Sequence, residues 1–148
     1  MKAINKSLES ELKVAVVKSL ENYQLADAGG SLSDLYIYYD VENQMLNFFD
    51  DTENPLYSVN LTDKNILLDD DSLKEVRFAA KFVLKELEKE HVFEKKFICK
   101  PFSVNLIDAD FIVTDELIFI DDDTLKLEGD FWGHVEKELN TFLKGLIQ

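Results

Sequence analysis

Apolar residues recur at helical spacing near the start of the chain. Over residues 5–24 they lie three or four positions apart, which places them on one face of a helix. Asn5 or Ser7 can cap this helix, and the pair Gly29-Gly30 follows as a stop signal. The core face of the predicted helix consists of Ile4, Leu8, Leu12, Val16, Leu20 and Tyr23.

Two later segments carry the same helical period. The pattern Ser72-x-x-Glu75 is typical of a capping box, in which each of the two side chains accepts a hydrogen bond from a backbone N–H at the helix start. It predicts a second helix over residues 72–91, and Asp130 begins a third over 130–148. The second core face consists of Leu73, Val76, Ala80, Val83 and Leu87, and the third of Phe131, Val135, Leu139, Phe142 and Leu146.

Between these helices the apolar period becomes two, which is typical of strands. Residues 34–61 predict three short strands, and residues 97–128 predict three more, with Pro101 indicating an edge position or a break. Connections within each group are short, which favours antiparallel pairing, because a parallel crossover needs about a dozen residues. The expected fold is therefore α+β: a single antiparallel sheet of about five or six strands with three helices, in the order α-βββ-α-βββ-α. A length of 148 residues predicts one domain over 1–148.

Composition narrows the class of protein. Apolar residues make up 46% of the chain and aromatic residues 11%, which excludes a disordered acidic tail. No apolar run approaches the length that a transmembrane helix needs, so we expect no membrane partner. The single cysteine, Cys99, allows no intrachain disulfide, and we expect it to be buried in a strand of a cytoplasmic protein.

The net charge of −14 is unevenly distributed. Residues 31–71 hold ten acidic residues and one lysine, and residues 101–130 hold nine acidic residues and one lysine. Residues 72–100, between them, hold eight basic and five acidic residues. Such a field repels phosphate backbones and attracts basic surfaces, so we predict no nucleic-acid partner and a protein partner with basic or apolar segments.

No residue pattern indicates catalysis. The two histidines, His91 and His134, fall in different predicted helices, and no acidic cluster has the spacing of a calcium loop. Glycine-rich phosphate loops and nucleophile elbows are also missing from the sequence. We therefore predict no catalytic residue, no metal site, no cofactor and no enzymatic activity.

The second predicted helix carries the clearest candidate interface. Lys74, Arg77, Lys81, Lys85 and Lys89 form a basic stripe opposite the core face, and Phe78 and Phe82 lie within or beside it. Either another part of the same chain covers the two rings, or they belong to a subunit interface. We take Phe78, Phe82, Lys81, Lys85 and Arg77 as candidate protein-interface residues and expect a homodimer, in which acidic loops of the partner subunit pair with Lys81 and Lys85.

The order of elements over residues 5–147 and the acidic charge resemble the type III secretion chaperone-like fold. The resemblance implies a homodimer that binds segments of client proteins without catalysis, with the middle helix contributing to the dimer contact. It rests on no residue motif, and the chain departs from the pattern in its longer middle helix and one extra predicted strand. Two functions follow as hypotheses: an acidic protein-binding module, chaperone-like or regulatory, and an immunity-type or nucleic-acid-mimicking inhibitor of a basic protein.

Overall fold

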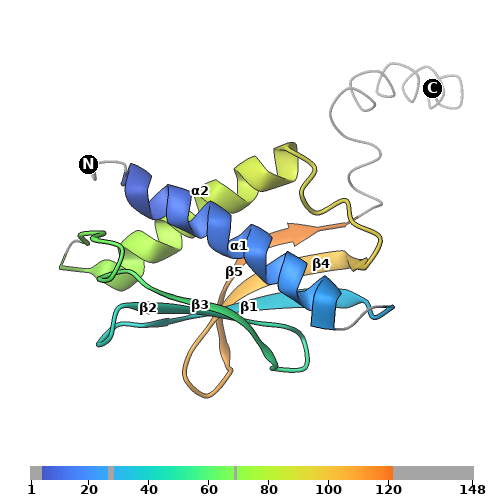
Figure 1. The fold of residues 1–148 in the computed structure, drawn as a ribbon, viewed down its shortest axis with the longest axis horizontal. Coiled ribbons are helices and arrows are strands. Elements are labelled where there is room, and N and C mark those ends of the chain that lie inside the picture. The colour runs from blue at the N-terminus through green and yellow to red at the C-terminus, as the bar shows by residue number, and fades with distance from the viewer. Residues whose placement is uncertain (1–4, 27–28, 69, 122–148) are drawn as a thin grey trace, which may run out of the picture.

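A computed structural model describes residues 5–26, 29–68 and 70–121 of the protein (Figure 1). Two helices and one five-stranded sheet make up this part, so the predicted α+β class is confirmed. The helices cover one face of the sheet, and the β4–β5 connection extends away from its other face. In chain order the elements are α1 (Lys6–Ala26), β1 (Leu32–Asp40), β2 (Met45–Phe49), β3 (Pro55–Asn60), α2 (Ser72–Lys89), β4 (Ile98–Ile107) and β5 (Val113–Ile120).

The sheet is mixed, which corrects the prediction of a purely antiparallel sheet. Its strand order is β3-β2-β1-β4-β5, and β1 and β4 run parallel, with Leu35 opposite Val104 and Ile37 opposite Leu106. The other three pairs are antiparallel. The short-connection argument holds inside the β1–β2–β3 meander and inside the β4–β5 hairpin. It fails between β3 and β4, where α2 provides a crossover long enough to bring the chain back parallel to β1.

The predicted core faces of both helices are largely confirmed. Leu8, Leu12, Val16, Leu20 and Tyr23 of α1 are all buried. In α2 the buried stripe is broader than expected, because Ala79 and Leu84 join Val76, Ala80, Val83 and Leu87. Leu73 was expected in the core but is 38% exposed, since it lies in the first turn of α2, where the helix passes the end of the sheet.

Both helices begin at polar caps, and one of them differs from the expected residue. The side chain of Asn5 accepts a hydrogen bond from the Leu8 N–H at 3.0 Å, which confirms Asn5 as the cap of α1. The cap of α2 is Asp71 rather than Ser72, and its carboxylate accepts from the Lys74 N–H at 3.2 Å. Glu75 accepts a hydrogen bond from Asn5 Nδ2 at 3.0 Å, which ties α2 to the start of α1.

Strand β4 is an inner strand of the sheet, between β1 and β5, although Pro101 suggested an edge or a break. The break is the correct alternative: β1 moves from Leu32 to Asp34 while β4 moves from Ile98 to Ser103, so the pairing is interrupted around the proline. Cys99 lies in this interrupted stretch and is exposed, not buried as expected. Cys99 is exposed because the regular pairing of β4 with β1 is interrupted at this position.

The predicted third helix over 130–148 and the last predicted strand, near residues 125–127, lie outside the described residues. The separate strand expected at 111–113 is instead the turn leading into β5, which begins at Val113. Neither helix in the described ranges is long and apolar enough to cross a membrane.

Candidate protein-binding surfaces

One face of the sheet is covered by neither helix, and the β4–β5 connection lies against part of it. Side chains at alternate strand positions point away from the helices and form what we call the open sheet face. The strand register aligns them in rows: Phe49, Tyr36, Asn105 and Glu116 in one, and Asp34, Ser103 and Phe119 in the next. Tyr38 and Asn47 belong to the same face. Its side chains are therefore rings, amides, hydroxyls and carboxylates.

Polar groups of the two rows are linked into a chain of hydrogen bonds. Asn105 Nδ2 donates to Ser103 Oγ at 3.1 Å, and Ser103 Oγ donates to Asp34 Oδ1 at 2.5 Å. Ser103 and Asn105 are buried, although they face away from the helices. Their polar atoms are thus satisfied inside the sheet surface, and the linked Asp34 carboxylate is held in place at its edge.

The β4–β5 connection adds a further ring to the open sheet face. Phe111, which has a positive φ of 62°, packs against Phe49 of β2 with ring centroids 4.9 Å apart in an edge-to-face arrangement. This contact joins segments that β1 separates in the sheet. Next to Phe111, Ile112 and Val113 are 60% and 50% exposed, so the apolar surface continues past the rings.

The open sheet face is negatively charged. Strands β1, β2, β3 and β5 contain no lysine or arginine, and the one basic residue of β4, Lys100, is bound to Glu94 at 2.8 Å. The pKa of the Tyr36 phenol reflects this environment. Burial raises this pKa, and the charges of Asp34, Asp51 and Glu53 raise it further. A cation on this face would meet several carboxylates and no competing basic side chain from these four strands.

A second surface lies on the outer side of α2. Phe78 is 61% exposed and Phe82 is 43% exposed, so no described part of the chain covers the two rings that the sequence singled out. They lie one helical turn apart. The exposed lysines around them are Lys74, Lys81, Lys85 and Lys89, and these six residues make up what we call the α2 outer surface.

Two of the candidate interface cations already have partners within the chain. Lys81 Nζ lies 3.2 Å from Asp115 Oδ2, and Arg77 Nε lies 3.8 Å from the same atom, on strand β5. These pairs fasten α2 to the end strand of the sheet. Lys85 forms no ion pair within the described residues, so it remains available to an acidic partner, whereas Lys81 is partly neutralised.

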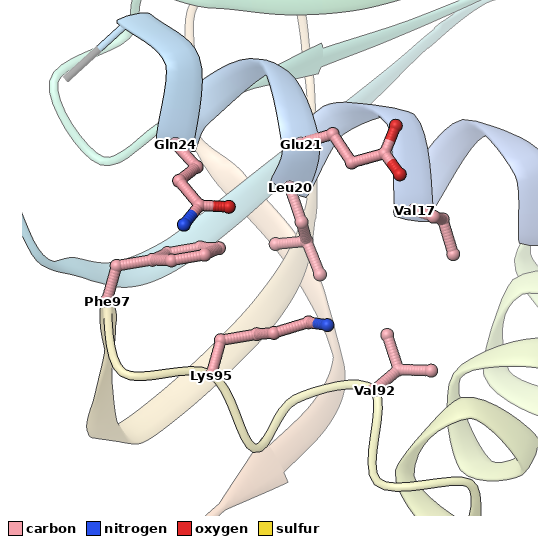
Figure 2. A pocket seen from close by; sticks show the side chains of 7 residues that line it. All are labelled: Val17, Leu20, Glu21, Gln24, Val92, Lys95 and Phe97. Atoms are coloured by element: carbon pink, nitrogen blue, oxygen red, sulfur yellow. The ribbon is translucent and has the colours of Figure 1, made fainter. Parts of the chain in front are cut away.

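The structure also holds a crevice of about 250 Å³ between the second half of α1 and the segment that precedes β4 (Figure 2). Val17 and Leu20 of α1 face Val92, while the ring of Phe97 lies under Gln24 and the stem of Lys95 runs beneath Leu20. Glu21 and Lys95 are the charged groups of its lining, which has no histidine, cysteine or serine. The crevice thus combines apolar side chains with one carboxylate, one amide and one amine.

The predicted candidates for chemistry do not converge. His91 is exposed just beyond the end of α2, and His134 lies outside the described residues. Among the residues that the structure describes, no group of three or more histidine, cysteine, aspartate or glutamate side chains is placed to hold a metal ion.

Sequence reasoning found the α2 outer surface but missed the open sheet face. The missed signal lies in β1 and β2, where the alternate positions that would normally be solvated carry Tyr36, Tyr38 and Phe49. The absence of lysine and arginine from four of the five strand segments was a second signal for this face. Comparisons with protein-family models, with curated proteins and with solved structures found no match to this chain.

Proposed function

We propose that this protein is a non-enzymatic, acidic protein-binding module, chaperone-like or regulatory, that acts as a homodimer in the cytoplasm. The observation that carries the proposal is the exposure of Phe78 and Phe82 on the α2 outer surface. Leaving both rings in water forgoes burial worth about 1.5–3 kcal/mol each. A resemblance to the type III secretion chaperone-like fold supports the same role, because its members are homodimers that contact each other through the middle helix.

The dimer contact that we propose brings the two rings of one protomer against those of its partner. The surrounding lysines would lie at the rim, where their aliphatic stems cover the rings and their ammonium groups stay hydrated. Acidic loops of the partner protomer would then pair with Lys85. Lys81 contributes less than expected from the sequence, because Asp115 of the same chain already pairs with it.

Analytical sedimentation of the double variant Phe78→Glu/Phe82→Lys tests this proposal. We expect wild-type protein to sediment as a dimer and the variant as a monomer with an unchanged circular dichroism spectrum. The matched control is Leu25→Glu/Leu67→Lys, which makes the same changes at positions that are 83% and 86% exposed, and it should remain a dimer. A wild-type monomer at high micromolar concentration would contradict the proposal.

The charge of the strands favours a second candidate, an immunity-type or nucleic-acid-mimicking inhibitor of a basic protein. Strands β1 and β5 carry carboxylates and no basic residue, and β2 and β3 carry no charged residue, so these four strands together are negatively charged, as a mimic of a polyanion requires. The two candidates differ in salt dependence. A captured partner that dissociates steeply as salt rises indicates the inhibitor, whereas one held by apolar contacts persists and indicates the chaperone-like module.

A further inference from the structure

We infer that the open sheet face is a docking surface for an extended, arginine-bearing segment of a partner protein. The inference rests on the proposed protein-binding role and adds to it a second surface and the chemistry of the partner. It is carried by the arrangement of rings and carboxylates on a sheet face that neither helix covers, and by the lack of basic residues in four of the five strands.

Rings and carboxylates are neighbours along two strands of this face. Tyr36 and Asp34 lie two positions apart on β1, and Phe119 and Glu116 lie on the same side of β5. Side chains two positions apart on a strand are separated by about 7 Å, so each carboxylate is within reach of a guanidinium that stacks on the neighbouring ring. Arginine suits such a surface better than lysine, because its planar group stacks on aromatic faces and donates to carboxylates together.

The negative charge of the open sheet face favours a positively charged segment. Asp34, Asp51 and Glu53 lie near Tyr36 at one end of the face, where burial and then their charges raise the pKa of its phenol. Glu116, at the other end, is exposed and forms no ion pair within the described residues. An acidic segment would be repelled here, and a purely apolar one would leave the negative charge of these carboxylates uncompensated.

Other occupants fit less well. Residues 122–148 of the chain itself hold six acidic residues and three lysines, so their net charge has the wrong sign. A second copy could offer only the α2 outer surface, whose Lys81 is already paired with Asp115. An extended segment crosses five strands, about 20 Å, with about six residues, and alternate side chains of such a segment all face the sheet.

The experiment uses the full chain and a synthetic peptide of about eight residues in which arginine and serine alternate. Binding is followed by fluorescence anisotropy of the labelled peptide. Glu116→Lys should weaken binding by about tenfold, because it places a cation beside the guanidinium groups. The control Glu21→Lys makes the same charge change at an exposed position on α1, and it should change the dissociation constant by less than about twofold. Equal losses in both variants would show attraction by net charge alone and would overturn the inference.

A second pair of variants tests the rings. Phe119 is 53% exposed, so Phe119→Ser can be made without opening the core, and it should weaken peptide binding by about threefold. Leu67→Ser, at a position 86% exposed in the connection before α2, should leave binding unchanged. If Phe119→Ser also leaves binding unchanged, the rings do not take part and the inference fails.

Two further measurements distinguish other occupants. The protein has a single tryptophan, Trp132, in the C-terminal part of the sequence. A change in its emission on Phe119→Ser without peptide would mean that the chain's own C-terminal segment occupies the face. Loss of dimers on Glu116→Lys in sedimentation would mean that a second copy does so. Either result would overturn the inference, and unchanged emission and unchanged dimers support it.

The dimer variant separates this inference from the proposed function. Phe78→Glu/Phe82→Lys alters the α2 outer surface and leaves the open sheet face intact. We expect it to bind the arginine peptide as wild type does, whatever its oligomeric state. Loss of peptide binding in this variant, with the fold preserved, would show that the peptide binds at α2 and would contradict the inference alone.

Discussion

The two faces of the sheet are built from the same strands but differ in covering and in charge. Phe48 of β2 lies under the helices and is completely buried, whereas its neighbour Phe49 faces the other side and is partly exposed. The two helices carry eight of the twelve basic residues in the described part of the chain, and four of the five strands carry none. One alternating pattern thus provides a core on one side and a surface suited to recognition on the other.

The difference also shows what an uncovered face needs in order to remain ordered. Under the helices, apolar burial stabilises the packing, with Leu35, Ile37 and Leu46 fully or almost fully buried. On the open sheet face the ring contact between Phe49 and Phe111 and the hydrogen bonds of Ser103 replace a covering element. We therefore expect matched substitutions on the two faces to have unequal effects.

The largest effect is expected for alanine substitutions at the two neighbouring phenylalanines. Phe48→Ala should lower the free energy of unfolding by about 3–5 kcal/mol, because it leaves a cavity under the helices. Phe49→Ala should cost only about 1–2 kcal/mol, through the partial burial and the ring pair with Phe111. Urea denaturation of both variants measures the difference. Equal costs would mean that the open sheet face is as deeply packed as the core.

A smaller contrast is expected between two asparagines. Asn5→Ala should cost about 1–2 kcal/mol, because Asn5 caps α1 and also donates to the buried Glu75. Asn47→Ala, on the open sheet face, should cost less than about 1 kcal/mol, because the Nδ2 contacts of Asn47 are 3.4 and 3.5 Å long and its one short bond, accepted from Ser58 Oγ at 2.8 Å, is exposed to water. Thermal unfolding followed by circular dichroism compares them, and a larger loss for Asn47→Ala would contradict the comparison.

Two tyrosines provide a pH-dependent contrast. Burial raises the pKa of both Tyr39, under the helices, and Tyr36, on the open sheet face, where nearby carboxylates raise it further. Because these phenols hold their protons longer in the folded state, their stabilisation is complete below an ordinary tyrosine pKa of about 10 and is lost as the pH rises through the raised values.

Spectrophotometric titration of the Tyr36→Phe and Tyr39→Phe variants assigns the two late-titrating phenols. Added salt should lower the pKa of Tyr36 towards its ordinary range, because salt screens Asp34, Asp51 and Glu53. A pKa of Tyr36 that does not respond to salt would mean that carboxylates do not shape the potential of the open sheet face.

The smallest effect is expected at two acidic neighbours in β5. Asp115 faces α2 and pairs with Lys81 and Arg77, whereas Glu116 faces the other side. Asp115→Asn should lower the free energy of unfolding by about 0.2–1 kcal/mol at low salt, and the loss should shrink as salt is added. Glu116→Gln should change stability by less than about 0.5 kcal/mol. A loss for Asp115→Asn that persists at high salt would point to a contact other than the ion pairs.

Local pattern determined a large part of this protein. The apolar spacing of α1 and α2 predicted which side of each helix is buried, since a helix repeats its faces every 3.6 residues whatever surrounds it. The strands of the first meander, the cap at Asn5 and the exposure of Phe78 and Phe82 away from the core stripe also follow from short-range geometry. These features depend on neighbours within a few positions along the chain.

Tertiary structure alone decided how distant segments meet. The parallel pairing of β1 with β4 depends on where the α2 crossover returns the chain, and no local pattern records that position. The parallel pairing of β1 with β4 also brings Phe49, Tyr36 and Glu116, from three different strands, into one row of the open sheet face. It also gives Lys81 its partner Asp115 and brings Glu75 to the side chain of Asn5. Each of these contacts joins residues far apart in sequence, and packing of the whole core sets their register.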